Sequence, residues 1–297
     1  MPQPDYKSGH IVIAGRPNVG KSTLFNALVG ERLSIVSPKP QTTRNNILGI
    51  LTDEHCQMLF LDTPGLLAEQ YRLHAFMGKQ IREALESADV LLGIVDASQF
   101  ETSFDSEVQE AFTKWDVPRI IVLNKMDLCS EDQLTVLQNL ISQTIKVERV
   151  IPISATTRKN VSELRQMLVD SLPVGPQFYP ADTLTEQPER FFVSEIIREE
   201  VFHQLHQELP YSIAVVVDAF HEDRPKVYIQ ANIIVERSSQ KGIVIGKGGR
   251  ALKTIGLNAR KKVEAFLGRS VFLDLHVKVH ENWRKKDSAL REFGYGI

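Results

Sequence analysis

The chain has 297 residues, of which 42% are hydrophobic and 24% are charged, and its formal net charge is −2. This composition is that of an ordinary globular protein, and the length predicts about two domains. No apolar stretch approaches the roughly 20 residues of a membrane span, and the first ten residues lack the pattern of a signal peptide. Cys56 and Cys129 are the only cysteines, so we expect no disulfide framework and no zinc site, as in a reducing cytoplasm.

The first predicted strand, 10–14, leads into the segment Gly15-Arg16-Pro17-Asn18-Val19-Gly20-Lys21-Ser22 and then into a helical pattern over 21–29. Strand, glycine loop and helix are the context that a phosphate-binding P-loop requires. Gly15 and Gly20 permit backbone conformations in which successive N–H groups converge on phosphate oxygens at a helix N-terminus. Lys21 is expected to reach the β- and γ-phosphates, and Ser22 to ligate Mg²⁺. The predicted phosphate-binding residues are Gly15, Asn18, Val19, Gly20, Lys21, Ser22, Thr23 and, from the next motif, Gly65.

The apolar run 58–61 leads into Asp62-Thr63-Pro64-Gly65. An aspartate at this place can hold Mg²⁺, usually through water, opposite Ser22, and the Gly65 N–H is placed to sense a γ-phosphate. The same tetrapeptide alone would more often be a plain turn. Its position downstream of a P-loop favours the nucleotide interpretation.

The predicted strand 119–123 ends at Asn124-Lys125-Met126-Asp127, whose last residue can read a guanine ring. The Asp127 carboxylate can accept hydrogen bonds from guanine N1–H and the exocyclic amino group. Adenine lacks both donors and would leave the carboxylate unpaired, at a cost of roughly several kcal/mol, so GTP is the predicted nucleotide. After the predicted strand 150–153, backbone N–H groups can reach guanine O6. The predicted guanine-binding residues are Asn124, which would tie this loop to the P-loop, Lys125, which would lie along the base, and Asp127, Ser154 and Ala155.

Residues 10–172 alternate short apolar runs with helical patterns. The runs are 10–14, 47–51, 58–61, 90–95, 120–123 and 150–153, and the helical patterns after the first are 71–87, 105–115, 131–144 and 161–171. Such alternation predicts an α/β domain with a mostly parallel sheet covered on both faces. Ligands of such sheets bind at the carboxyl ends of the strands, where each of these motifs begins.

Four prolines, at 173, 176, 180 and 188, interrupt this pattern and predict a linker of limited flexibility over 173–188. The expected domains are therefore 1–172 and a smaller α+β domain, 189–297. In the second domain we expect a helix 190–208, strands 213–219 and 226–236, a glycine loop, a helix to about 267 and a strand 271–279.

The glycine loop of the second domain reads Gly246-Lys247-Gly248-Gly249 and lacks the Lys-Ser ending of a P-loop. From Gln240 to Lys262 there are seven basic residues and no acidic one: Lys241, Lys247, Arg250, Lys253, Arg260, Lys261 and Lys262. On charge alone a solvated basic helix face would be the commoner explanation. The order of elements decides against it, because a Gly-x-x-Gly loop in an α-β-β-α-α-β order resembles a type II KH module, which clamps single-stranded RNA.

That resemblance predicts RNA-binding residues Ile245, Gly246, Lys247, Gly248, Gly249, Arg250 and Lys253. Val244, Ile245, Leu252 and Ile255 are candidates for either the apolar groove or the core.

The P-loop, Asp-Thr-Pro-Gly and Asn-Lys-Met-Asp motifs, with Gln41-Thr42-Thr43-Arg44 and the KH segment, resemble the Era-type GTPases over almost the whole chain. The resemblance implies a GTP- and Mg²⁺-dependent monomer that binds 16S rRNA near its 3′ end and acts in assembly of the 30S ribosomal subunit. It places Thr42 and Thr43 in a switch loop and leaves open which of them ligates Mg²⁺. The implied magnesium residues are Ser22, Thr42, Thr43 and Asp62, and the implied catalytic or switch residues are Asn18, Lys21, Thr42, Thr43, Asp62, Gly65 and Leu66.

Leu66 stands where Ras-like enzymes carry the glutamine that orients the attacking water, so we expect slow intrinsic hydrolysis. In related GTPases an asparagine at the position of Asn18 helps to bind a catalytic K⁺. The hypothesis that this holds here competes evenly with a role of Asn18 in bracing the loop. Two further alternatives remain open: hydrolysis that only resets an RNA-binding module, and a peripheral attachment to the inner membrane.

Overall fold

The computed structural model describes residues 5–37, 39, 41–67, 70–205, 209–223 and 225–296. Contacts divide the chain into two compact units. The first comprises Met1–Ser34, Thr43–Ala68 and Met77–Glu186, and the second comprises Ile35–Thr42, Glu69–Phe76 and Gln187–Ile297. Among the described residues, no helix is both long and apolar enough to cross a membrane.

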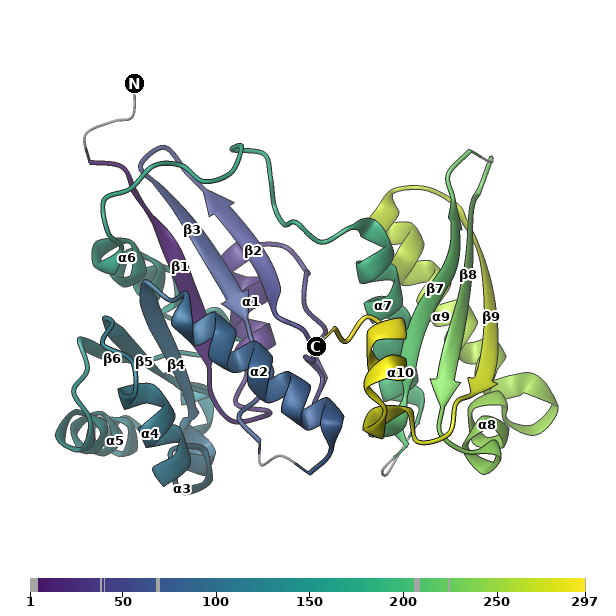
Figure 1. The fold of residues 1–297 in the computed structure, drawn as a ribbon. Coiled ribbons are helices and arrows are strands. Elements are labelled where there is room, and N and C mark those ends of the chain that lie inside the picture. Colours follow the sequence, from purple (N-terminus) through teal and green to yellow (C-terminus); the bar gives the residue numbers. More distant parts are fainter. Residues whose placement is uncertain are drawn as a thin grey trace. The chain divides into compact units, whose positions relative to one another are not determined.

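The first unit is built on a six-stranded sheet of order β2-β3-β1-β4-β5-β6 (Figure 1). Its strands are β1 (Lys7–Ala14), β2 (Ile47–Thr52), β3 (Cys56–Asp62), β4 (Val90–Asp96), β5 (Arg119–Asn124) and β6 (Arg149–Pro152). β2 is antiparallel to β3, and the other neighbours are parallel. All seven residues of β4 are buried, as expected of a strand covered on both faces. The predicted α/β class is confirmed.

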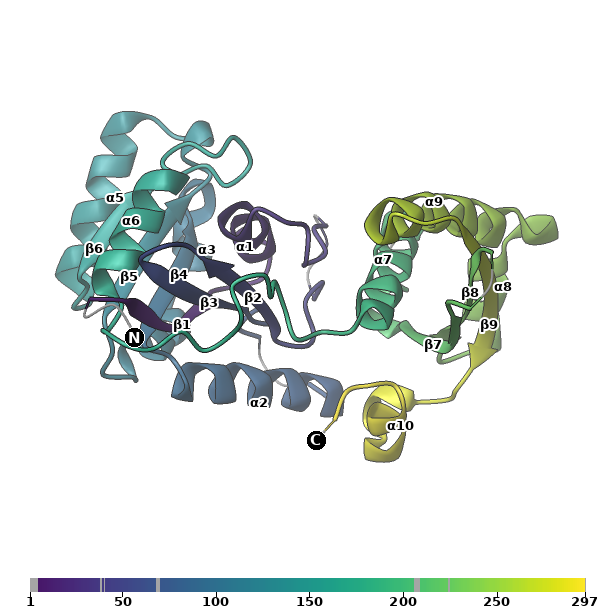
Figure 2. The ribbon, with the colours of Figure 1, turned by 90° about the horizontal axis from the view of Figure 1, so that it is seen from above.

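Helices cover both faces of this sheet. α1 (Lys21–Val29) and α2 (Arg72–Glu86) lie on opposite faces (Figures 1 and 2). Residues of α2, α4 (Ser106–Thr113) and α5 (Glu131–Thr144) share a buried cluster with β1, β4 and β5. α6 (Val161–Ser171) contacts α1, and the short elements are α3 (Phe100–Ser103), η1 (Ala97–Gln99) and η2 (Met126–Leu128). This arrangement brings the loops after β1, β3, β5 and β6 to one edge of the sheet.

The proline-rich segment after α6 is held against the first unit by the fully buried side chain of Gln57 on β3. Its Oε1 accepts the N–H groups of Phe178 (2.8 Å) and Tyr179 (3.0 Å), and its Nε2 donates to the Tyr179 carbonyl (2.8 Å). Further along, the Ile50 N–H donates to the Leu184 carbonyl at the edge strand β2. The start of the segment is also attached to β1, where Ser8 Oγ donates to the Pro176 carbonyl over 2.7 Å, so the segment contacts the sheet along most of its length.

We expect Gln57→Leu to lower the free energy of unfolding by about 2 kcal/mol, because it leaves buried or partly buried backbone groups without their partners. Protease cleavage within 173–184 should also become faster. Urea unfolding and limited proteolysis measure the two effects. Gln177→Ala is the matched control, since the exposed Gln177 amide also donates to Tyr179 and its loss should cost less than about 0.5 kcal/mol. Equal effects of the two substitutions would contradict the role of Gln57 in holding the proline-rich segment.

The second unit contains a three-stranded sheet of order β7-β8-β9, with β8 antiparallel to β7 and parallel to β9. Its elements in chain order are α7 (Glu189–Gln204), η3 (Pro210–Ser212), β7 (Ala214–His221), β8 (Val227–Val235), α8 (Ser238–Ile245), η4 (Lys247–Gly249), α9 (Arg250–Leu267), β9 (Val271–Val279), η5 (Trp283–Lys285) and α10 (Asp287–Glu292). The core lies between α7, α8 and α9 and one face of the sheet (Figure 2).

The α-β-β-α-α-β order matches the prediction, and the strand 271–279 is placed as predicted. The helix expected over 190–208 ends at Gln204, and residues 206–208 lie outside the described part of the chain. Trp283 in the C-terminal segment is fully buried, and its indole N–H donates to the Ser212 carbonyl over 2.9 Å. The tail is thus part of the core of this unit.

Candidate functional site

The loop between β1 and α1 has a backbone that only particular residues permit. Gly15 and Gly20 have φ of 155° and 103°, and Asn18 has φ of 64°. A Cβ on Gly20 would lie 2.2 Å from Asn124 Nδ2, so this position excludes any side chain. Gly20 also forms the N-cap of α1, whose first N–H groups face the loop. The result is a loop of main-chain donors at a helix N-terminus, which is an anion site by construction.

Lys21 lies inside this loop with only 7% of its surface exposed. Its Nζ donates to the carbonyls of Gly15 (3.1 Å) and Arg16 (2.9 Å), which close the loop around the ammonium. Burial lowers the pKa of Lys21 from 10.5 to about 8, against the opposing charge of Asp62. A charged lysine that is held among carbonyls and short of solvent is prepared to bind a polyanion.

The pKa of Lys21 makes a testable contribution to stability. Between about pH 8 and 10.5 the unfolded chain keeps this proton and the folded chain loses it, so stability rises with pH through that window. From about pH 7 to about pH 9.5 the nucleotide-free protein should gain about 2 kcal/mol from this group. Urea unfolding should show that Lys21→Met loses the gain while Lys146→Met, at an exposed lysine, keeps it. An unchanged pH dependence in Lys21→Met would contradict the burial of a charged ammonium.

Three hydroxyl groups converge on one carboxylate oxygen at the end of β3. Asp62 is fully buried, and its Oδ2 accepts from Ser34 Oγ (2.7 Å), Ser22 Oγ (2.8 Å) and Thr43 Oγ1 (3.3 Å). The Ser22 and Thr43 hydroxyls lie 3.0 Å apart. Burial raises the pKa of the Asp62 carboxyl, and the Ser34 hydroxyl is the strongest of the contacts that oppose the rise. The other oxygen, Oδ1, is buried without a hydrogen-bond partner among the described residues.

The two neighbouring threonines of the predicted switch loop have different partners. The Thr43 hydroxyl lies in the cluster with Ser22 and Asp62, whereas the Thr42 hydroxyl donates to the Lys39 carbonyl over 2.8 Å. The structure therefore brings Thr43 and not Thr42 to the predicted magnesium ligands.

The loops after β5 and β6 are joined to the P-loop by one amide. Asn124 Nδ2 donates to the Val19 carbonyl (2.7 Å), and Asn124 Oδ1 accepts the Ala155 N–H (3.0 Å), which is the tie that the sequence predicts. The Ser154 N–H already donates to the Lys159 carbonyl. The N–H groups of Ser154 and Ala155, which the sequence predicts to contact guanine, thus already donate to other partners in the structure. It stays a prediction.

Two charged side chains of the loop after β5, Lys125 and Asp127, differ in their surroundings. Asp127 is exposed, and Lys125 Nζ lies 2.5 Å from Oδ2 of the buried Asp96. Lys125 has φ of 63°, and its ion pair fixes a side chain that the sequence places along a base. An exposed carboxylate beside a fixed aliphatic stem is suited to a flat, amino-bearing ring.

Leu66 is partly buried against the core of the first unit. Its N–H donates to the Gly15 carbonyl, and its own carbonyl accepts from Arg16 Nη1 over 3.1 Å. The Arg16 guanidinium is held by Asp105 and Glu107 at the start of α4. Gly65 lies so close to the P-loop that a Cβ there would meet Pro17 at 2.7 Å.

Three residues at this site were missed by sequence reasoning. Ser34 contacts Asp62, which lies 28 residues away in the chain, and Arg16 contacts Asp105, which lies 89 residues away. No sequence motif indicates either contact. Asp96 could have been found, because it directly follows the predicted strand 90–95 and therefore lies at the carboxyl edge of the sheet.

The glycine loop of the second unit has positive φ angles and is exposed at its tip, at Lys247 and Gly248. Gly246, Gly248 and Gly249 have φ of 72°, 61° and 76°, and a Cβ at either of the last two would meet no atom within 4 Å. Lys247 in this loop is exposed, as are Arg250 and Lys253 at the start of α9. The backbone of the loop is thus open to a ligand and surrounded by cations.

The apolar candidates around this loop separate into two kinds. Val244 and Ile255 are fully buried in the core, while Ile245 and Leu252 are partly buried against it. Ile243 and Leu257 are 57% and 47% exposed, although the sequence did not single them out. Exposed apolar side chains beside the glycine loop are the better candidates for contacts with a base.

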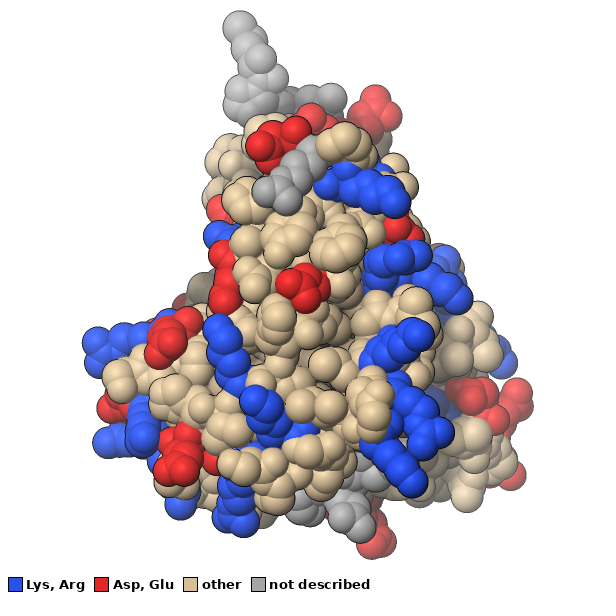
Figure 3. All heavy atoms as spheres, turned by 90° about the vertical axis from the view of Figure 1, so that its right-hand side faces the viewer, with Lys and Arg blue, Asp and Glu red and all other residues tan. Residues whose placement is uncertain are grey.

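The basic surface is smaller than the sequence indicates. Lys262 lies 2.9 Å from Glu199 and 2.5 Å from Glu200 on α7, so it serves as an internal ion pair of the second unit. Figure 3 shows Lys and Arg side chains along the right side and the lower part of one face, with Asp and Glu side chains among them. Lys262 is therefore unavailable to a partner, whereas the other six basic residues of this segment are exposed: Lys241, Lys247, Arg250, Lys253, Arg260 and Lys261.

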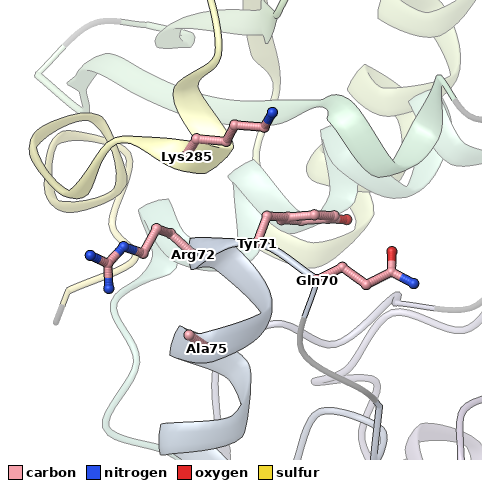
Figure 4. A pocket seen from close by; sticks show the side chains of 5 residues that line it. All are labelled: Gln70, Tyr71, Arg72, Ala75 and Lys285. Atoms are coloured by element: carbon pink, nitrogen blue, oxygen red, sulfur yellow. The ribbon is translucent and has the colours of Figure 1, made fainter.

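A hollow elsewhere in the second unit is lined by Gln70, Tyr71, Arg72, Ala75 and Lys285 (Figure 4). Its two cations point away from each other, and Arg72 lies 3.7 Å from Asp287. The Tyr71 ring lies 4.7 Å from the Arg284 guanidinium, which donates to the tyrosine hydroxyl over 3.2 Å. These contacts account for the side chains by internal packing, and we assign the hollow no ligand.

A P-loop with a guanine-reading loop on a mostly parallel sheet, followed by a KH-like unit, defines a class: P-loop GTPases that carry an RNA-binding module. Comparisons with known proteins agree. Residues 10–125 match the family described as 50S ribosome-binding GTPase, and residues 208–284 match the KH domain.

GTPase Era of Alkaliphilus metalliredigens is 44% identical over 293 residues, which cover 98% of this chain and 99% of that protein. GTPase Era of Carboxydothermus hydrogenoformans is also 44% identical, over 98% of each chain. Among solved structures, Era in complex with MgGDPNP and nucleotides 1506–1542 of 16S ribosomal RNA matches with a TM-score of 0.94 at 36% identity. It covers 98% of this chain and 100% of that one. A single-residue variant of Aquifex aeolicus Era bound to GDP·AlF4⁻ matches with a TM-score of 0.93 at 36% identity, with the same coverage.

The chain belongs to the Era family of GTPases. It is a GTPase that hydrolyses GTP to GDP and phosphate, and its second unit is a KH domain.

Proposed function

We propose that this GTPase is a nucleotide-controlled clamp for the 3′ end of 16S rRNA in assembly of the 30S subunit. The Gly246–Gly249 loop, with positive φ angles and open space at Gly248 and Gly249, lies in a chain that also holds a GTP site, and this observation carries the proposal. The similar Era crystallised with MgGDPNP and nucleotides 1506–1542 of 16S rRNA supports the choice of RNA. Residues 1–172 hold the GTPase function, 173–188 serve as the linker, and 189–297 bind RNA.

The phosphates of GTP lie in the P-loop and against Gly65. Main-chain N–H groups from Asn18 to Thr23 donate to the phosphate oxygens, and Lys21 turns from the loop carbonyls to the β- and γ-phosphates. Asn18 and Val19 shape this backbone, since Asn18 has a positive φ and the Val19 carbonyl is held by Asn124. Asn124, Lys125, Asp127, Ser154 and Ala155 form the guanine side of the site.

The residues around Asp62 fit a magnesium ion. Hydroxyl and carboxylate oxygens are the ligands that Mg²⁺ takes, and Asp62 Oδ1 is a buried acceptor that lacks a partner among the described residues. Ser22 and Thr43 would ligate the ion, and Asp62 would hold it through water. When bound, the ion neutralises charge that develops on the phosphate oxygens. Thr43 is the proposed magnesium ligand of the two threonines, because the Thr42 hydroxyl donates to the Lys39 carbonyl.

Hydrolysis proceeds without a side chain at position 66 that can orient water. The partly buried Leu66 instead excludes solvent beside the phosphate site, so the attacking water depends on backbone groups. We propose slow intrinsic turnover that K⁺ stimulates through Asn18.

Single-turnover hydrolysis by wild type should be at least about 10-fold faster in K⁺ than in Na⁺, and Asn18→Ala should remove that difference. Asn46→Ala, away from the P-loop, is the control. Equal rates in the two salts for wild type would contradict a catalytic K⁺.

Crosslinking to a mixture of ribosomal RNAs tests the RNA assignment. With a GTP analogue bound, wild type should crosslink to the last nucleotides of 16S rRNA, through a surface that includes Lys247, Arg250 and Lys253. Crosslinks spread evenly over 16S and 23S rRNA would overturn the choice of RNA.

We expect the chain to act as a monomer in the cytoplasm, and attachment to the inner membrane is a secondary expectation without a structural feature in its favour.

A further inference from the structure

Ser34 belongs to none of the nucleotide-binding motifs, yet it makes the shortest contact of the Asp62 carboxylate. Its side chain is almost completely buried, at 2% exposure. Its Oγ donates to Asp62 Oδ2 over 2.7 Å, compared with 2.8 Å for Ser22 and 3.3 Å for Thr43. The Ser34 hydroxyl thus donates to Oδ2 of Asp62 and makes no hydrogen bond to the second oxygen, Oδ1.

The main chain of Ser34 is fixed by one side chain of α1. Asn26 Oδ1 accepts the Ser34 N–H (2.9 Å) and the Leu33 N–H (3.0 Å), and Asn26 Nδ2 donates to the Ser34 carbonyl (2.8 Å). Asn26 lies four residues after Ser22, so the two side chains leave the same face of the helix. α1 therefore presents one predicted ligand directly and positions the neighbouring carboxylate through Ser34.

We propose that Ser34 is a positioning residue for the magnesium site: it holds the Asp62 carboxylate by Oδ2, beside the Ser22 and Thr43 hydroxyls, and Oδ1 remains as an acceptor for the water shell of the ion. The proposal rests on the proposed Mg²⁺-nucleotide site. Because the partners of Ser34 are α1 and β3 and not the nucleotide, it acts with GDP as well as with GTP. Hydrogen bonds of this kind to a ligating carboxylate tune metal affinity, and their loss typically costs about 10- to 100-fold.

The test measures how fast a fluorescent GDP analogue leaves the full chain as MgCl₂ is increased from zero, with EDTA at the starting point. Wild-type release should slow as Mg²⁺ binds. In Ser34→Ala the Mg²⁺ concentration for half of this effect should rise about 10-fold, with the release rate in EDTA within about twofold of wild type. Ser34→Thr, which keeps the hydroxyl, should remain closer to wild type than Ser34→Ala. Thermal unfolding confirms that each variant is folded, and Ser34→Cys, of similar volume, replaces Ser34→Ala should the latter not fold.

The possible results distinguish the magnesium site itself from the positioning role of Ser34. Wild-type release that ignores Mg²⁺ would overturn the magnesium site itself. A wild-type Mg²⁺ effect with an unshifted midpoint in folded Ser34→Ala or Ser34→Cys would overturn the positioning role alone. Faster release in EDTA by the same factor as in Mg²⁺ would also overturn it, because the hydroxyl would then only maintain packing.

Discussion

Replacing Asp127 with asparagine should lower the affinity for GTP by about 10³-fold and create affinity for xanthosine triphosphate. The carboxylate is exposed in η2, where it can accept two hydrogen bonds from guanine. Each such bond to a charged group contributes about 1.5–3 kcal/mol, so losing both gives a change of this size. An asparagine amide donates a hydrogen bond instead, which suits the C2 carbonyl of xanthine. Competition against a fluorescent nucleotide measures both affinities.

Asp132→Asn is the matched control, because it removes the same charge from an exposed position at the start of α5. Its GTP affinity should stay within about twofold of wild type. If Asp127→Asn kept GTP affinity within about threefold of wild type, or failed to prefer xanthosine triphosphate, the assignment of the guanine loop would be wrong.

Introducing aspartate at both Gly248 and Gly249 should lower the affinity for a 16S rRNA 3′-end oligonucleotide by at least about 100-fold. The side chains would occupy the face where an RNA backbone approaches, and their charges would repel its phosphates. The fold should persist, since no atom lies within 4 Å of an added Cβ at either position. The left-handed φ costs only roughly 1–2 kcal/mol per residue. Binding is measured at one fixed salt concentration.

The chain offers a close control for this pair. Gly268 has φ of 64°, also has no atom within 4 Å of an added Cβ, and lies at the other end of α9. Gly268→Asp therefore imposes the same backbone strain and the same charge as Gly248→Asp while leaving the loop intact. RNA affinity that falls equally in these two single variants would refute the glycine loop as the RNA contact.

Regular elements of the fold were predictable where local signals agree. The bounds of α5 at 131–144 follow from a helical period of apolar residues that begins directly after the N-cap Ser130. The Ser130 hydroxyl and the Gln133 side chain form a capping box. β4 and β5 follow from continuous apolar runs. No bounds were predicted for α8 and α10, because both helices are short and their ends depend on the glycine loop and on packing of the tail.

The site divides in the same way. The P-loop and the Asn124 contact follow from motifs whose residues must meet a common ligand. The Ser34–Asp62 hydrogen bond and the Lys262 ion pairs join segments that no local pattern relates, so only the folded chain reveals them. Sequence reasoning also left Thr42 and Thr43 equivalent, whereas in the structure the Thr42 hydroxyl donates to the Lys39 carbonyl and the Thr43 hydroxyl donates to Asp62.

The claim that the nucleotide controls RNA binding is tested most directly by one comparison of affinities. The 16S rRNA 3′-end oligonucleotide is titrated into the full chain loaded with Mg·GDPNP and, separately, with Mg·GDP, at the same salt concentration. A switch of ordinary coupling strength predicts affinity about 10-fold higher in the GDPNP form, and by linkage GDPNP affinity that rises by the same factor when RNA is bound. Equal RNA affinity in the two nucleotide forms would contradict control of RNA binding by the nucleotide.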